Sequence, residues 1–206
     1  MKSTKNLLEM IKSLPHLSKD TVHQLGKQLG LKDVTIDTYI SRFLKNKELI
    51  RLKNGLYVSA DFFNKQKGNI SYSFYLANVI RTPSYVSSWG ALQYYNLTTE
   101  RIYDITSVTT KVTRTYKTKV GTFTYQSMDD ELFSDFSLVK GTFDFYLASA
   151  AKALFDLLYF RTHQFRGVSL KGAKILIEKL RIDMDEMSDE EQVKFYALVH
   201  SHLHHE

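Results

Sequence analysis

Polar and basic side chains recur along one side of residues 33–47, and their chemistry suits the edges of base pairs. They are Thr35, Thr38, Ser41, Arg42 and Lys45. A guanidinium group donates two hydrogen bonds to a guanine edge, which makes Arg42 the candidate for that contact. Thr35 and Thr38 suit a thymine methyl group or a phosphate. We therefore expect these side chains to face the major groove of a DNA duplex.

The spacing of apolar residues predicts the helix that carries these side chains. The apolar positions are Ile36, Tyr39, Ile40, Phe43 and Leu44. Intervals of three or four residues put them on one face, so residues 34–47 are expected to form an amphipathic helix. Asp33 is the expected N-cap of this helix.

A β-hairpin is expected directly after this helix. The apolar runs Leu49–Leu52 and Leu56–Val58 flank an Asn-Gly pair, which is a strong hairpin signal and predicts positive φ at both turn residues. We expect Lys53 and Asn54 at the tip, with Arg51 behind them, to reach the DNA backbone or the minor groove.

Two further helices are expected to precede these elements. An apolar stripe runs from Leu7 to Leu14, and Ser18 is a good N-cap for a second helix that ends at Gly30. The short connection from Gly30 to Asp33 forces the second and third helices to cross steeply. With the hairpin, this order predicts a winged helix-turn-helix DNA-binding domain over residues 1–65.

The charge of the chain is unevenly distributed. Residues 1–65 hold twelve Lys or Arg against six Asp or Glu, a net charge of +6, whereas residues 66–206 hold sixteen of each. A basic region confined to one module is typical of nucleic-acid binding, because neutralising phosphates releases condensed counterions. A lysine-rich solvated surface is the alternative interpretation.

The rest of the chain, residues 66–206, is expected to form a mixed α+β domain, because helical and strand patterns alternate along it. The expected helices cover residues 70–80, 87–95, 149–160, 170–180 and 188–203, the last with a capping box from Ser188 to Glu191. The expected strands cover residues 102–112, 121–125, 136–139 and 143–147. The 206 residues contain no cysteine, no signal-peptide pattern and no membrane-spanning run, so we expect a cytoplasmic protein.

Four blocks occur in an order and spacing that resemble one protein family. They are Gly55–Val58, Pro83–Leu92, Ser107–Arg114 and Ala148–Tyr159. Together they resemble the AbiEi-type antitoxins of the abortive-infection AbiE toxin-antitoxin systems. Many of those relatives carry Pro-Glu where Ala150 and Ala151 stand in this chain.

The resemblance implies a transcriptional repressor that binds inverted repeats in its own promoter, as a monomer or a DNA-assisted dimer. It also implies that the second domain counteracts a nucleotidyltransferase-like toxin, with which the antitoxin need not form a stable complex. A solitary winged-helix regulator, whose second domain senses a ligand or drives oligomerisation, is the alternative.

A second set of cations lies over two expected strands. It consists of Arg101, Lys111, Arg114, Lys117 and Lys119, with tyrosines between them. Cations that alternate along a strand line one face, which suits a nucleic acid or a toxin-related surface. Lysines also protect an exposed sheet from edge pairing, and the sequence favours this second interpretation.

Neither a cofactor nor catalysis is expected. Acidic clusters at 129–135 and 183–186 lack a fixed ligand spacing, which favours solvated turns over a metal site. Four histidines crowd residues 200–205, where a frayed tail or a purification-tag remnant is favoured over a zinc or nickel site. The chain has no phosphate-binding glycine loop and no nucleophile elbow, so we expect that it is not an enzyme.

Overall fold

The computed structural model describes residues 2–100 and 104–203. These residues mix helices and strands, so the predicted α+β class is confirmed. The chain divides into two compact units, one of residues 1–72 with 116–121 and the other of residues 73–115 with 122–206. The domain boundary predicted between residues 65 and 66 lies shortly before this division.

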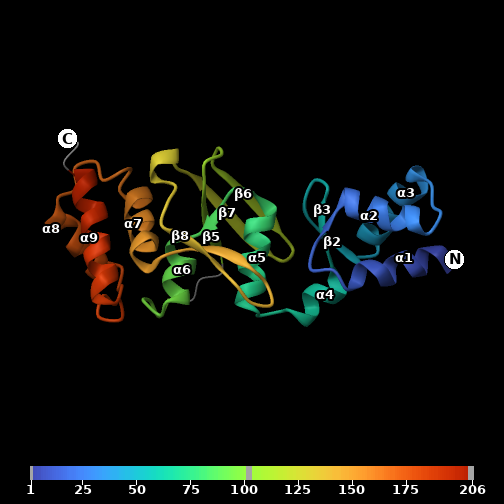
Figure 1. The fold of residues 1–206 in the computed structure, drawn as a ribbon, viewed down its shortest axis with the longest axis horizontal. Coiled ribbons are helices and arrows are strands. Elements are labelled where there is room, and N and C mark those ends of the chain that lie inside the picture. The colour runs from blue at the N-terminus through green and yellow to red at the C-terminus, as the bar shows by residue number, and fades with distance from the viewer. Residues whose placement is uncertain (1, 101–103, 204–206) are drawn as a thin grey trace. The chain divides into compact units, whose positions relative to one another are not determined.

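The first unit consists of helices followed by a hairpin and one more short helix (Figure 1). Its elements are α1 Lys2–Lys12, β1 Leu17–Ser18, α2 Lys19–Gln28, α3 Asp33–Lys45, β2 Leu49–Lys53, β3 Leu56–Ser59 and α4 Ala60–Lys65. The strands form a small antiparallel sheet in the order β1-β3-β2, in which Leu17 pairs with Tyr57 and Leu49 pairs with Ser59. The two-residue strand β1 was not predicted, because it is too short to show an alternating pattern.

Helix α2 begins as its sequence predicts, whereas α3 does not. The Ser18 side chain accepts a hydrogen bond of 2.9 Å from the Thr21 backbone N–H, which confirms the predicted N-cap. The predicted capping role of Asp33 is wrong, because α3 starts at Asp33 itself and its cap residue Lys32 makes no side-chain cap hydrogen bond. The Asp33 carboxylate instead accepts a hydrogen bond from His23 of α2.

The turn between β2 and β3 differs from the predicted type. Gly55 has a φ of 73°, but Asn54 does not have positive φ, so the expectation for both turn residues is wrong. Asn54 and Gly55 still form a two-residue turn between the paired residues Lys53 and Leu56, and the strand register shifts just before it, between Arg51 and Lys53.

The core of the first unit lies between its three long helices and the sheet. The buried apolar positions of α3 are Ile36, Ile40 and Phe43, as the helical spacing predicted. They pack with Leu7 and Ile11 of α1, both fully buried. At the crossing of α2 and α3, a Cβ atom added at Gly26 would lie 2.5 Å from the Ile36 side chain, so a larger residue there would require that side chain to shift.

The second unit is built on a six-stranded mixed sheet in the order β6-β7-β5-β4-β9-β8 (Figure 1). Its strands are β4 Tyr85–Val86, β5 Ile105–Thr109, β6 Arg114–Thr118, β7 Gly121–Ser127, β8 Phe136–Val139 and β9 Phe145–Ala148, although residues 116–121 of β6, its turn and β7 are grouped with the first unit. Its helices are α5 Ile70–Ile80, which begins in the first unit, α6 Ser88–Tyr94, the short η1 Asp130–Leu132, α7 Ala150–Arg161, α8 Leu170–Lys179 and α9 Asp189–Leu203. No helix in the described part of the chain is long and apolar enough to cross a membrane.

Several strand predictions hold only in part. β4 was not predicted, because two residues are too few to show an alternating pattern. It is nevertheless central in the sheet, where Tyr85 and Val86 pair with β5 and Val86 pairs with β9. β5 is shorter than the strand predicted over residues 102–112, whose residues 102 and 103 lie outside the described residues.

The predicted capping box of α9 is half formed. The Glu191 backbone N–H donates a hydrogen bond of 3.4 Å to the Ser188 hydroxyl. The Glu191 carboxylate, however, accepts a hydrogen bond of 2.7 Å from the Ala151 backbone N–H in the first turn of α7. The Glu191 side chain therefore connects α9 to α7 instead of capping its own helix.

Helix α7 is the most enclosed element of the second unit. Every residue from Ala150 to Tyr159 is buried, and the helix packs against α6 and α9. Its apolar residues therefore cover the whole helix surface, as in helices buried on all sides. This burial also encloses two charged residues, Lys152 and Asp156, which lie one turn apart.

Lys152 and Asp156 form an ion pair inside the core. The Lys152 ammonium lies 2.8 Å from Asp156 Oδ1, and the two side chains are 1% and 0% exposed. Asp156 Oδ2 accepts hydrogen bonds of 2.6 Å from the Ser87 hydroxyl and 3.1 Å from the Tyr85 hydroxyl. Burial raises the pKa of the Asp156 carboxyl, and the ammonium and the two hydroxyl donors oppose this effect.

Breaking this pair is expected to destabilise the protein strongly. Asp156→Asn leaves the Lys152 ammonium buried without a countercharge, so the free energy of unfolding should fall by roughly 3–5 kcal/mol. Urea titration monitored by circular dichroism measures this. Lys194→Met is the matched control, because it removes an ion pair of 2.8 Å with Asp135 that is partly exposed, and it should lose less than about 1 kcal/mol. Equal losses in the two variants would contradict the role of burial.

Candidate nucleic-acid interface

The outward side of α3 carries four of the five side chains that the sequence placed there. Thr38, Ser41, Arg42 and Lys45 are exposed, whereas Thr35 is half-buried. The exposed residues succeed one another at intervals that keep them on the side opposite the buried Ile36, Ile40 and Phe43. The structure thus brings these four together on one surface and places Thr35 at its margin.

Two hydroxyl groups on this surface are held by the helix itself. The Thr38 hydroxyl donates a hydrogen bond of 2.8 Å to the Val34 carbonyl, and the Ser41 hydroxyl donates one of 3.0 Å to the Asp37 carbonyl. Each hydroxyl therefore keeps its lone pairs as acceptors, and the Thr38 methyl group is fixed in orientation.

Arg42 lies on the side of this surface nearest α1. Together with Lys5, Leu8 and Phe43 it lines a groove of about 540 Å³ between α1 and the end of α3. A guanidinium on a long side chain can cover apolar surface with its methylene groups while its charged end stays in solvent. Arg42 therefore belongs both to the polar surface of α3 and to the lining of this groove.

The sequence interpretation missed Val34, which belongs to the same surface. Its side chain is 80% exposed at the start of α3, the highest value among the exposed large apolar residues of the described chain. An apolar group at that position can contact a thymine methyl. The signal was present in the sequence, since Val34 is one helical turn before Thr38 and outside the apolar spacing.

The hairpin offers a second surface in the same unit. Arg51 and Asn54 are exposed and Lys53 is half-buried. The Lys19 backbone N–H donates a hydrogen bond of 2.8 Å to the Gly55 carbonyl, which ties the hairpin turn to the first residue of α2. The hairpin is therefore anchored to the helices at its tip as well as at its base.

A network of charged side chains joins α2 to the start of α3. The two ring nitrogens of His23 each lie 2.9 Å from a carboxylate oxygen, one of Asp33 and the other of Asp37. Lys19 lies 2.9 Å from Asp37, and Lys27 lies 3.3 Å from Asp33. Three cations thus neutralise two carboxylates that would otherwise oppose a negatively charged ligand.

This network shifts the pKa values of its members. Hydrogen bonds to Asp33 and Asp37 raise the pKa of the His23 imidazole. The hydrogen bonds from His23 and Lys27 lower the pKa of the Asp33 carboxyl, and those from Lys19 and His23 lower the pKa of the Asp37 carboxyl. Donation from both ring nitrogens requires the protonated imidazolium, so the geometry and the direction of the shift agree.

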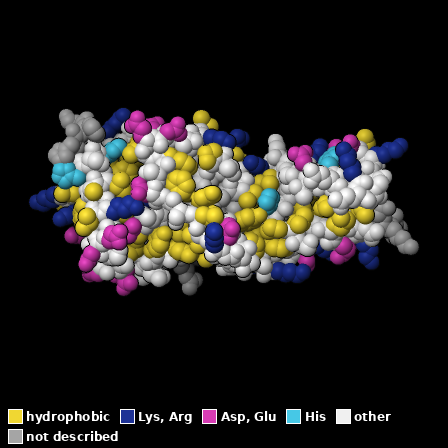
Figure 2. Space-filling view, viewed as in Figure 1, with side chains coloured by type: hydrophobic (Ala, Val, Ile, Leu, Met, Phe, Trp, Pro, Cys, Tyr) yellow, Lys and Arg dark blue, Asp and Glu magenta, His cyan; other side chains and the backbone are white. Residues whose placement is uncertain are grey.

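The charge contrast between the two units is larger than the predicted domain boundary suggests. The first unit holds fifteen Lys or Arg and six Asp or Glu, a net charge of +9, while the second holds thirteen and sixteen, a net charge of −3. On the face shown in Figure 2, cationic side chains of the first unit lie at several separate places, with acidic side chains among them. The basic character thus belongs to the unit as a whole.

The second set of cations does not form the single row that was expected. Arg114 and Lys117 are three positions apart on β6, so the strand pleat directs them to opposite faces. Lys111 precedes β6 and donates a hydrogen bond of 2.5 Å to the Thr82 carbonyl, and Lys119 lies in the turn before β7. Arg101 lies outside the described residues. The expectation of one basic face is therefore wrong for Arg114 and Lys117.

The residues considered for metal binding have other surroundings. Within residues 2–100 and 104–203, no three His, Asp or Glu side chains gather as a metal site would require. The expected fraying of the tail is wrong for His202, which lies in α9 with its ring 5.3 Å from that of Tyr159 and 5.7 Å from that of Phe155. His204 and His205 lie outside the described residues.

Comparison with known proteins adds no further guide. No protein-family model matches the sequence, and no curated protein matches it.

The His23 network predicts a pH-dependent stability of the α2–α3 pair. Because the pKa of His23 is raised above its usual value of about 6.5, its stabilisation is complete below that pH and is lost as the pH rises through the raised pKa. His23→Gln should remove this loss. Hydrogen-exchange protection factors of α2 and α3 amides, measured between about pH 5.5 and about pH 8.5, report it.

His16→Gln is the control with the opposite sign. Burial lowers the pKa of His16, so its stabilisation is present above about pH 6.5 and is lost as the pH falls. Wild-type and His23→Gln protection factors that depend on pH identically would contradict the imidazolium bridge.

Proposed function

We propose that the first unit is a winged helix-turn-helix that binds double-stranded DNA, with α3 as the recognition helix and the β2–β3 hairpin as the wing. The observation that carries the proposal is the exposed surface of Thr38, Ser41, Arg42 and Lys45 on α3, in a unit of net charge +9. In this arrangement α3 enters the major groove, where its side chains contact base edges.

The wing residues have a different role in this proposal. The wing binds phosphates or the adjacent minor groove through Arg51, Lys53 and Asn54. These contacts position the protein on the duplex without recognising the DNA sequence. The network around His23 supports the same assignment, because it removes the charge of two carboxylates near the start of α3.

The order of family blocks along the chain supports a more specific proposal. The protein is a cytoplasmic, non-enzymatic repressor that binds promoter inverted repeats and serves as the antitoxin of an AbiE-like pair. Its second unit counteracts a nucleotidyltransferase-like toxin without requiring a stable complex. The alternative is a solitary regulator whose second unit senses a ligand or drives oligomerisation, and the observation that supports ligand sensing is a pocket in that unit.

Loss of cations from α3 and the wing should weaken DNA binding in a salt-dependent manner. Arg42→Gln with Lys53→Gln is expected to lower affinity and to reduce the slope of log affinity against log salt by about one unit per lost phosphate contact. Fluorescence anisotropy with promoter inverted-repeat DNA, over a series of salt concentrations, measures both. The matched control is Lys171→Gln with Lys179→Gln on α8, which removes the same charge and should leave the slope unchanged. A double variant that binds like the wild type would refute the groove assignment.

Growth rescue tests the antitoxin assignment separately. The neighbouring reading frame is expressed alone, with the full chain, and with a chain that lacks residues 66–206. We expect growth arrest from the first and recovery only with the full chain. Full-length Arg42→Gln with Lys53→Gln should still restore growth, because the assigned activity lies in the other unit. Absence of toxicity from the neighbouring frame would favour the solitary regulator.

A further inference from the structure

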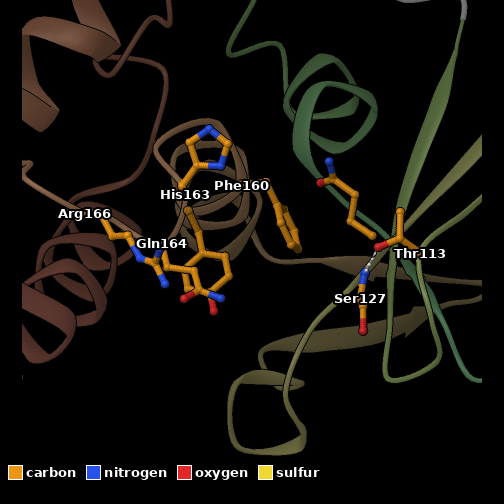
Figure 3. A pocket seen from close by; sticks show the side chains of 8 residues that line it. Thr113, Ser127, Phe160, His163, Gln164 and Arg166 are labelled. Carbon is orange, nitrogen blue, oxygen red and sulfur yellow. Dashed lines mark hydrogen bonds between the residues drawn. The ribbon is translucent and has the colours of Figure 1, made fainter.

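A pocket of about 340 Å³ lies wholly within the second unit, between the end of α7 and strand β7 (Figure 3). One wall comes from α7 and the turn after it, and the other from β7 and the segment before β6. The lining residues are Tyr159, Phe160, His163, Gln164 and Arg166 on the first wall and Thr113, Gln126 and Ser127 on the second.

The first wall has an unusual backbone. His163, Gln164 and Phe165 have successive φ values of 51°, 70° and 60°, which is rare for residues other than glycine. Phe165 is buried and packs 5.5 Å from the Phe155 ring, and this contact holds the turn in place. His163 and Gln164 are exposed and line the pocket. Strained backbone of this kind persists only where the surrounding packing enforces it.

The second wall presents hydrogen-bonding groups. The Ser127 backbone N–H donates a hydrogen bond of 3.1 Å to the Thr113 hydroxyl, drawn as a dashed line in Figure 3. The Thr113 hydroxyl proton remains for a ligand. The half-buried Gln126 amide, which can both donate and accept, has no partner among the described residues.

The lining contains cationic and polar groups but no carboxylate. Arg166 is exposed, and its guanidinium has no partner in the described part of the chain. Tyr159 is only 4% exposed, yet no described residue hydrogen-bonds its hydroxyl. The hydroxyl lines the pocket and is available to a ligand as a donor or an acceptor. Burial also raises the pKa of Tyr159, so that its hydroxyl stays a neutral donor.

We propose that this pocket binds a nucleoside monophosphate, with the phosphate on Arg166 and the base against the Phe160 ring. A guanidinium matches two phosphate oxygens at once, and an aromatic face stacks on any base. The Gln126 and Gln164 amides complement the donors and acceptors of a base edge. A volume near the lower end of the roughly 300–1,000 Å³ of ligand pockets selects a mononucleotide over a dinucleotide.

Isothermal titration of the full chain with AMP, GMP, CMP and UMP tests this proposal. At least one is expected to bind with a Kd below about 1 mM, and inorganic phosphate or the parent nucleoside alone should bind at least about tenfold more weakly. Arg166→Gln and Phe160→Ala should each weaken binding by about tenfold or more. Thermal melts of the variants confirm that they are folded.

Two control variants distinguish binding in this pocket from a general effect of positive charge. Arg161→Gln removes a neighbouring exposed arginine that does not line the pocket, and Arg42→Gln removes one from the DNA-binding surface of the first unit. Both should bind the nucleotide like the wild type. Failure of all four nucleotides to bind would overturn the proposal. So would equal loss in Arg166→Gln and Arg161→Gln, or equal affinity for phosphate alone. None of these results bears on DNA binding by the first unit.

Discussion

The close crossing of α2 and α3 at Gly26 is the constraint on which the first unit depends. A Cβ atom at that position would overlap the Ile36 side chain at 2.5 Å, so no larger residue permits the same approach without a shift. Glycine inside a helix costs about 1 kcal/mol relative to alanine, which indicates that this position serves packing and not helix propensity. With the crossing set, Ile36, Ile40 and Phe43 face the core and the polar side of α3 faces outward.

Electrostatics reinforces this packing. The cations of α2 and the carboxylates of α3 meet beside the crossing, where His23 contacts both Asp33 and Asp37. The same contacts orient one helix on the other and cancel negative charge near the proposed DNA-binding surface. A unit of net charge +9 can therefore present a positive field along α3 even though that helix begins with an acidic residue.

The second unit uses buried polarity in two different ways. Around Asp156 each carboxylate oxygen has a partner, an ammonium for one and two hydroxyl groups for the other, so the network fixes α7 against the segment that contains Tyr85 and Ser87. One turn further along α7, Tyr159 is 4% exposed as a residue and lines the pocket, and no described residue hydrogen-bonds its hydroxyl. Asp156 thus takes part in a structural contact inside the core, whereas Tyr159 lines a candidate binding site.

The short-range features of the first unit and the positions of its main helices along the chain could be predicted from the sequence alone. The Ser18 cap, the apolar face of α3 and the hairpin near Gly55 depend on neighbours within a few residues, and the sequence places them correctly. Val34 was not predicted to belong to the exposed surface of α3, because an apolar side chain is normally assigned to a core. Lys152 and Asp156 have the spacing of a solvated helix pair, and only the packing of α6 and α9 around α7 buries them. The pocket beside Tyr159 likewise joins residues about fifty positions apart, from Thr113 to Arg166, whose proximity is decided by strand pairing and helix packing that no local pattern encodes.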